Sequence, residues 1–133
     1  MSRPPPSMDA WLKEAKADSS ADKIGMYLFH NGVVRATPKA QVRLGEVTGK
    51  TVSGMDFSFD QDKAAEAVAQ TSQMAGIYYI RVWLNAGRLR PGDDLMYVLV
   101  GGDIRPHVVA ALESLVETLK TQCVIEKEIF DST

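Results

Sequence analysis

The stretch DLMYVLV, residues 94–100, is apolar at both odd and even positions once its first residue is passed. Side chains of an extended strand alternate between the two faces of a sheet, so this run places apolar groups on both faces. Such a pattern is typical of a central strand. The sequence therefore predicts a sheet that has residues 94–100 in its interior.

The segments around this strand alternate between strand and helix patterns. Strands are expected at residues 52–59, 77–85 and 124–130, and helices at residues 61–75 and 106–120. Asp60 suits the N-cap of the first helix, and Pro106 suits the first turn of the second. The resulting order is the split βαβ pattern of two-layer α+β domains. We expect a mainly antiparallel sheet with helices on one face.

The N-terminal part of the chain has a weaker rhythm. Residues 1–23, with prolines at positions 4–6, predict a flexible lead-in that contains a possible short helix at residues 8–17. A single domain is expected over residues 24–133, beginning with a strand at residues 24–30.

Turns and loops are expected at three further places. Asn31-Gly32 indicates either a hairpin turn or a glycine bulge. Residues 36–50 predict a loop or a weak hairpin, and RLRPGD at residues 88–93 predicts a turn. Arg81 shares its strand face with Tyr79 and Trp83, so we expect that face to be solvated or to contact another subunit.

Composition excludes several classes of protein. The 133 residues carry a net charge of −2, so the chain as a whole lacks the basic character of nucleic-acid-binding proteins. The single cysteine rules out an internal disulfide, and the spacing of possible ligands predicts no metal site. No apolar run is long enough to cross a membrane, and residues 1–11 do not resemble a signal peptide. We expect a cytoplasmic protein.

The C-terminal stretch TLKTQCVIEKEIF, residues 118–130, carries two lysines in an otherwise mostly apolar setting. Lys120 falls in the last turn of the predicted helix, where a cation is favoured by the helix dipole. Lys127 shares strand parity with Ile125 and Ile129. It either extends to solvent at an edge or lines a partly desolvated pocket. Cys123 is most simply a small buried apolar residue.

The stretch VGGDIRPH, residues 100–107, runs into the second helix. Free backbone N–H groups at a helix start attract anions, and Arg105 can add a charge-assisted hydrogen bond. A turn made by the two glycines is the simpler interpretation of the same residues.

Four segments together resemble one known family. They are VVR at residues 33–35, AGRLRPGDD at residues 86–94, the helix start with Arg105, and LKTQCVIEKE at residues 119–128. In this order and spacing they resemble the large, catalytic subunit of molybdopterin synthase, the MoaE family. The similarity runs over residues 24–128 and implies an α/β hammerhead fold.

The resemblance also implies a function. Members form a homodimer that binds a small ubiquitin-like sulfur-carrier subunit at each end, giving a heterotetramer. Two sulfurs pass from the thiocarboxylate tail of the carrier to cyclic pyranopterin monophosphate, which becomes the molybdopterin dithiolene. No organic cofactor or metal is implied for this step.

The resemblance assigns roles to four residues of this chain. It implies that Lys120 is catalytic near the thiocarboxylate and that Lys127 helps to position the tail or the pterin. Arg35 and Arg105 would bind the anionic groups of the substrate and the carrier. A lysine with a lowered pKa can transfer protons or attack an acyl carbon.

Several positions depart from the family pattern. Leu84 and Asn85 stand where the family usually has His-Arg, Ile104 replaces a histidine, and Glu126 replaces a tryptophan. These changes leave an alternative open, in which the chain is a catalytically impaired relative that binds the carrier as an interaction module. A third possibility is an unrelated α+β domain whose lysines are surface residues.

Overall fold

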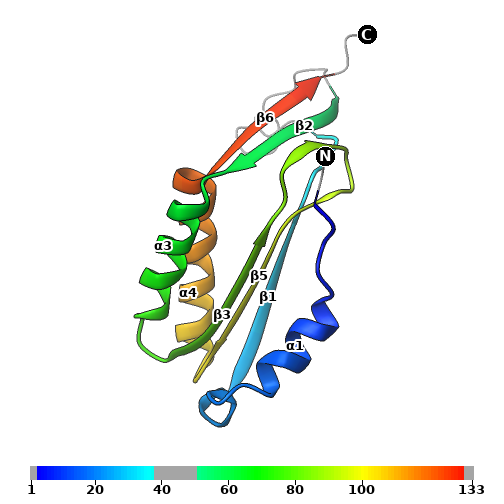
Figure 1. Cartoon of the computed structure of the whole chain (residues 1–133). Helices are drawn as coiled ribbons and strands as arrows, with labels where there is room; N and C mark the ends of the chain where they lie inside the picture. Colours follow the sequence, from blue (N-terminus) through cyan, green and yellow to red (C-terminus); the bar gives the residue numbers. More distant parts are fainter. Residues whose placement is uncertain (1–2, 38–50, 131–133) are drawn as a thin grey trace.

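The computed structural model describes residues 3–37 and 51–130 and contains two three-stranded antiparallel sheets with helices around them (Figure 1). In chain order the elements are α1 (Met8–Lys16), the 3-10 turn η1 (Ala21–Lys23), β1 (Met26–Val33), β2 (Val52–Phe59), α3 (Gln61–Ser72), β3 (Ile77–Leu84), β4 (Gly87–Leu89), β5 (Asp94–Gly102), α4 (Arg105–Thr118), the π-turn η2 (Leu119–Cys123) and β6 (Val124–Phe130). The strand orders are β1-β5-β3 and β4-β2-β6.

Strand β5 is the central strand of the first sheet, as predicted. It pairs antiparallel with β1 on one side and with β3 on the other. Every residue from 95 to 102 is buried. The apolar run therefore forms the interior of the sheet because each of its faces is covered.

The two faces of β5 belong to two separate cores. Met96, Val98 and Val100 pack in the cluster that includes the buried faces of α3 and α4. Tyr97 and Leu99 pack in a second cluster, under α1. The predicted α+β class is confirmed, and α1 adds a layer on the sheet face opposite α3 and α4 (Figure 1).

Helix α1 covers the aromatic face that the sequence left to solvent or to a subunit contact. Trp11 is buried and meets Tyr97 edge to face, with ring centroids 6.2 Å apart. The Arg81 guanidinium lies 4.8 Å from the centre of the Trp11 ring and forms an ion pair with Glu14. The expectation for this face was wrong, because the chain's own N-terminal helix covers it.

The element bounds agree closely with the predictions where a pattern was strong. Strands β2 and β6 occupy the predicted residues, and the Asp60 carboxylate accepts a hydrogen bond from the backbone N–H of Lys63 at 3.0 Å, as an N-cap does. Asn31-Gly32 forms no hairpin turn, because β1 continues through it with a register shift at Gly32. The turn predicted at residues 88–93 is shorter than expected, because its first two residues belong to β4. Residues 38–50 of the expected loop lie outside the described residues.

A tight turn joins α3 to β3 at Gly76, whose φ is +78°. A Cβ placed there would lie 2.2 Å from Oδ1 of Asp103 and 2.4 Å from Nδ1 of His107. These two side chains are themselves paired at 2.7 Å, and the backbone N–H of Asp103 donates to the carbonyl of Gly76 at 2.9 Å. The turn therefore depends on the missing side chain for both its backbone angle and its space.

We expect Gly76→Ala to destabilise the fold more than Gly92→Ala. Gly92 also has a positive φ, of +96°, but nothing lies within 4 Å of a Cβ built there. The control therefore reports only the backbone penalty of about 1–2 kcal/mol, while Gly76→Ala also displaces the Asp103–His107 pair. Urea denaturation of both variants measures the difference, and equal losses would contradict this account of the turn.

Candidate functional site

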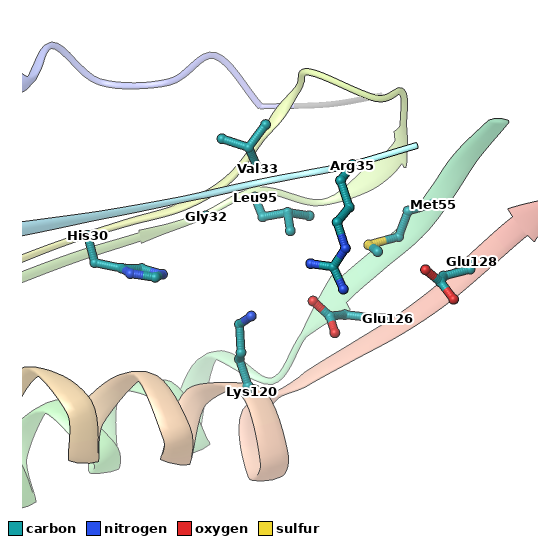
Figure 2. A pocket seen from close by; sticks show the side chains of 9 residues that line it. All are labelled: His30, Gly32, Val33, Arg35, Met55, Leu95, Lys120, Glu126 and Glu128. Atoms are coloured by element: carbon teal, nitrogen blue, oxygen red, sulfur yellow. The ribbon is translucent and has the colours of Figure 1, made fainter. Parts of the chain in front are cut away.

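A cavity of about 180 Å³ lies between the end of β1, the turn after α4 and the second sheet (Figure 2). Its lining comes from five parts of the chain and includes both cationic and acidic side chains. The lining residues are His30, Gly32, Val33, Arg35, Met55, Leu95, Lys120, Glu126 and Glu128.

Buried neighbours fix the backbone of the two cationic residues. Arg35 follows Val34, which is 2% exposed and whose N–H donates to the carbonyl of Asp93 at 2.9 Å. Lys120 follows Leu119, which is fully buried in the core. Since the adjacent residues are held by packing, the starting points of both long side chains are fixed. The structure thus brings together two of the four predicted site residues.

The cavity has mixed charge. Figure 2 shows Arg35, Lys120 and Glu126 directed toward one another from three different elements. Glu128, two residues further along β6, lines the same wall because alternate residues of a strand share a face. Glu126, which stands where the family usually has an aromatic residue, therefore places a carboxylate beside the cations.

His30 also lines the cavity, and sequence reasoning missed it. It follows Met26 and Leu28 on the face of β1 that packs toward the main core. Its Nε2 atom is buried and has no hydrogen-bond partner among the described residues. Burial lowers the pKa of His30, and the positive charge of Lys120 lowers it further. The signal in the sequence was a polar residue with the parity of Met26 and Leu28.

Lys127 does not line this cavity. It is exposed on the opposite face of β6, in register with Asp56 of β2. The pKa of Asp56 is lowered mainly by the hydrogen bond from Arg88, with a smaller contribution from Lys127. Ile125, on the same face as Lys127, is 70% exposed, so shared parity with isoleucines did not indicate a pocket. The functional role of Lys127 remains a prediction.

Arg105 lies at the other end of α4 from Lys120 (Figure 1). The helix has 14 residues, so its ends are about 20 Å apart at 1.5 Å per residue. The glycines before it form no anion-binding turn, because Gly101 and Gly102 are the last residues of β5. A Cβ on Gly102 would lie 2.7 Å from Val108, which gives a packing reason for that glycine. The role of Arg105 in anion binding remains a prediction.

The residues that stand at the departures from the family pattern differ in their burial. Leu84 and Asn85 are buried. The Asn85 side chain donates to the carbonyl of Asp94 at 2.8 Å and accepts from the backbone N–H of Ala86 at 2.8 Å and of Arg3 at 2.6 Å. Asn85 thereby ties the N-terminal segment to the β3–β4 connection. Ile104, by contrast, is 52% exposed.

Cys123 is buried in the main core, as predicted, and burial raises the pKa of its thiol. Within residues 3–37 and 51–130, no group of three or more histidine, cysteine, aspartate or glutamate side chains is arranged to hold a metal ion. None of the described helices has the length and apolar character needed to span a membrane.

Comparison with known proteins decides the family. The family described as MoaE protein matches residues 4–122, which is most of the chain. The chain belongs to the MoaE family. Membership supports a role in molybdenum cofactor biosynthesis. No functionally curated protein matches the chain significantly.

Solved structures share the fold. The molybdopterin synthase of Staphylococcus aureus matches with a TM-score of 0.74 and 17% identity, over 97% of this chain and 88% of that chain. A MoaE protein from Burkholderia ambifaria matches with a TM-score of 0.70 and 18% identity, over 98% and 86%. A complex of subunits 1 and 2 of molybdopterin-converting factor from Helicobacter pylori matches with a TM-score of 0.66 and 14% identity, over 95% and 77%.

We expect His30→Phe to flatten the dependence of stability on pH between about 5 and 7. The pKa of His30 is lowered in the folded state, so the unfolded state binds its proton more readily. The free energy of unfolding is therefore highest above the histidine pKa of the unfolded chain, about 6.5, and it decreases as the pH falls below that pKa. Denaturant unfolding at several pH values tests this. His107, present in both proteins, cancels in the comparison, and identical pH profiles would contradict the assignment.

Proposed function

We propose that this chain acts as the large subunit of a molybdopterin synthase. It transfers sulfur from a thiocarboxylated ubiquitin-like carrier to cyclic pyranopterin monophosphate and so forms the molybdopterin dithiolene. Family membership supports this reaction, and one observation carries its location: Lys120 and Arg35 face the same cavity.

The proposed reaction needs positive charge around two anions. The substrate carries a phosphate, and the carrier tail carries a thiocarboxylate. Arg35 offers a planar guanidinium for bidentate hydrogen bonds, and Lys120 offers a compact ammonium group. A positioned lysine can move protons to and from the reacting groups. Lys120 therefore takes the catalytic role in this proposal, and Arg35 binds an anionic group.

The proposed assembly follows the family pattern. The Helicobacter pylori structure that the chain resembles is a complex of two subunits, which supports a small-subunit partner for this chain as well. We further propose a homodimer with one carrier at each end, in the cytoplasm. Lys127 and Arg105 lie away from the described cavity of their own subunit, so any part that they take would involve a bound partner.

Lys120→Ala should reduce molybdopterin formation by at least about a hundredfold, because a positioned proton-transfer group contributes roughly 10²–10⁴ in rate. The measurement is product formation from purified thiocarboxylated carrier and pyranopterin substrate. Lys16→Ala, an exposed lysine change at the end of α1, is the matched control and should leave the rate unchanged. Full activity of the Lys120 variant would overturn its assignment.

A second function has its own support. If the chain is a catalytically impaired relative, it binds the carrier as an interaction module without turnover. The observations that favour this reading are Asn85, whose side chain is committed to structural hydrogen bonds, and Glu126, which adds negative charge to the cavity. Carrier binding by calorimetry together with no product would establish the module, and product formation would exclude it.

Glu126→Gln should strengthen the binding of sulfate to the cavity several-fold, because a negative charge near the cations opposes a second anion. The dissociation constant for sulfate, measured at constant ionic strength, tests this. Glu66→Gln on α3 is a control that removes the same charge away from the cavity lining. An equal effect of both substitutions would show that only net charge matters.

A further inference from the structure

The Nε2 atom of His30 is the buried side-chain nitrogen or oxygen that has no hydrogen-bond partner in the described part of the chain. Buried polar atoms are nearly always paired, since an unpaired one keeps its desolvation penalty. Here the unpaired atom belongs to a residue that lines a cavity together with Arg35 and Lys120. Its position therefore points to a partner that arrives with a ligand.

Gly32 lies close to the buried nitrogen of His30 and carries no side chain. A Cβ on Gly32 would lie 3.6 Å from the Nε2 atom and 3.2 Å from Cγ of Met96. Gly32 is itself part of the cavity lining. A side chain at this position would press against Met96 and contact Nε2, so the glycine keeps the space next to the nitrogen free of a further Cβ.

We propose that His30 is a third anion-binding group of this cavity: an oxyanion held between Arg35 and Lys120 accepts a hydrogen bond from His30 Nε2–H, and His30 takes up a proton from solvent as the anion binds. The ligand class is a doubly charged oxyanion such as a phosphate group. The inference deepens the proposed function, on which it rests only for the statement that the cavity binds an anion.

The charges around His30 explain why protonation is coupled to binding. In the free protein, burial and the ammonium of Lys120 lower the pKa of His30 and so favour the neutral imidazole. A bound dianion offsets the charge of Lys120 and accepts the Nε2–H, and both effects favour imidazolium. The other charged residues that share a cavity lining with His30 are Arg35, Glu126 and Glu128 in one cavity and Glu113 and Glu117 of α4 in another.

The test follows the two histidines of the chain, with His30 as the probe. Imidazole proton–carbon NMR spectra are recorded against pH with and without sulfate, at constant ionic strength. Sulfate remains a dianion from pH 5 to 8, so its own titration does not interfere. His107, which pairs with Asp103 near the start of α4, shows separately whether sulfate also binds near Arg105.

Sulfate should raise the pKa of His30 by about 1. Between the pKa of His30 with sulfate and its pKa without sulfate, the dissociation constant for sulfate should fall by up to about tenfold for each unit by which the pH is lowered. Lys120→Ala should abolish both effects. An unchanged His30 titration with sulfate bound, or absence of sulfate binding, would overturn the proposal.

Two substitutions separate the hydrogen bond from the charge. His30→Gln keeps an N–H donor that does not titrate, so sulfate binding should persist without the pH dependence. His30→Phe keeps an aromatic ring and removes the donor, so binding at pH 6 should weaken about tenfold relative to the unaltered protein. Unfolding measurements confirm that each variant is folded, and equal sulfate affinity of the Phe variant would overturn the proposal.

These readouts are independent of sulfur transfer. A protein that binds sulfate with a raised His30 pKa but forms no molybdopterin supports the histidine contact and removes the proposed function. A protein that forms molybdopterin while His30 is indifferent to sulfate keeps the function and removes the histidine contact.

Discussion

The burial of β5 on both faces is the constraint on which the rest of the structure depends. A strand with apolar side chains on each side must be covered twice, once by α3 and α4 and once by α1. Strand β1 pairs with β5 in this sheet, and α4 packs on the sheet face that α3 also covers. The end of β1 and the turn after α4 then reach the same end of the molecule, and the cavity forms between them (Figure 1, Figure 2).

The predictions succeeded where a pattern was regular and failed where burial depended on distant neighbours. Strands β2 and β6 were predicted with their observed bounds, and Asp60 was recognised as an N-cap. Strand β4 has only three residues, too few for an alternation to be seen. Parity placed Lys127 with isoleucines, yet Ile125 is exposed. Parity tells which residues share a face, and only tertiary packing decides whether that face is covered.

The candidate site was predictable in part. Arg35 and Lys120 were identified through a family resemblance, and the structure places both on one cavity. His30 could not be found in that way, because a single histidine in a strand follows no motif. Its unpaired Nε2 became visible only with the packing of β1 against α4. Sequence patterns therefore located the cations, while three-dimensional contacts revealed the group that stands beside them.

The π-turn at Leu119–Cys123 connects Lys120 to β6 and sets how many residues separate them. Neighbouring residues of a strand point to opposite faces, so a shift of one position reverses every side chain. Insertion or loss of one residue in this turn, with the β2–β6 pairing following it, would exchange Glu126 and Glu128 for Lys127 on the cavity wall. If the pairing follows the turn in this way, the length of the turn determines the sign of the charge that faces Lys120.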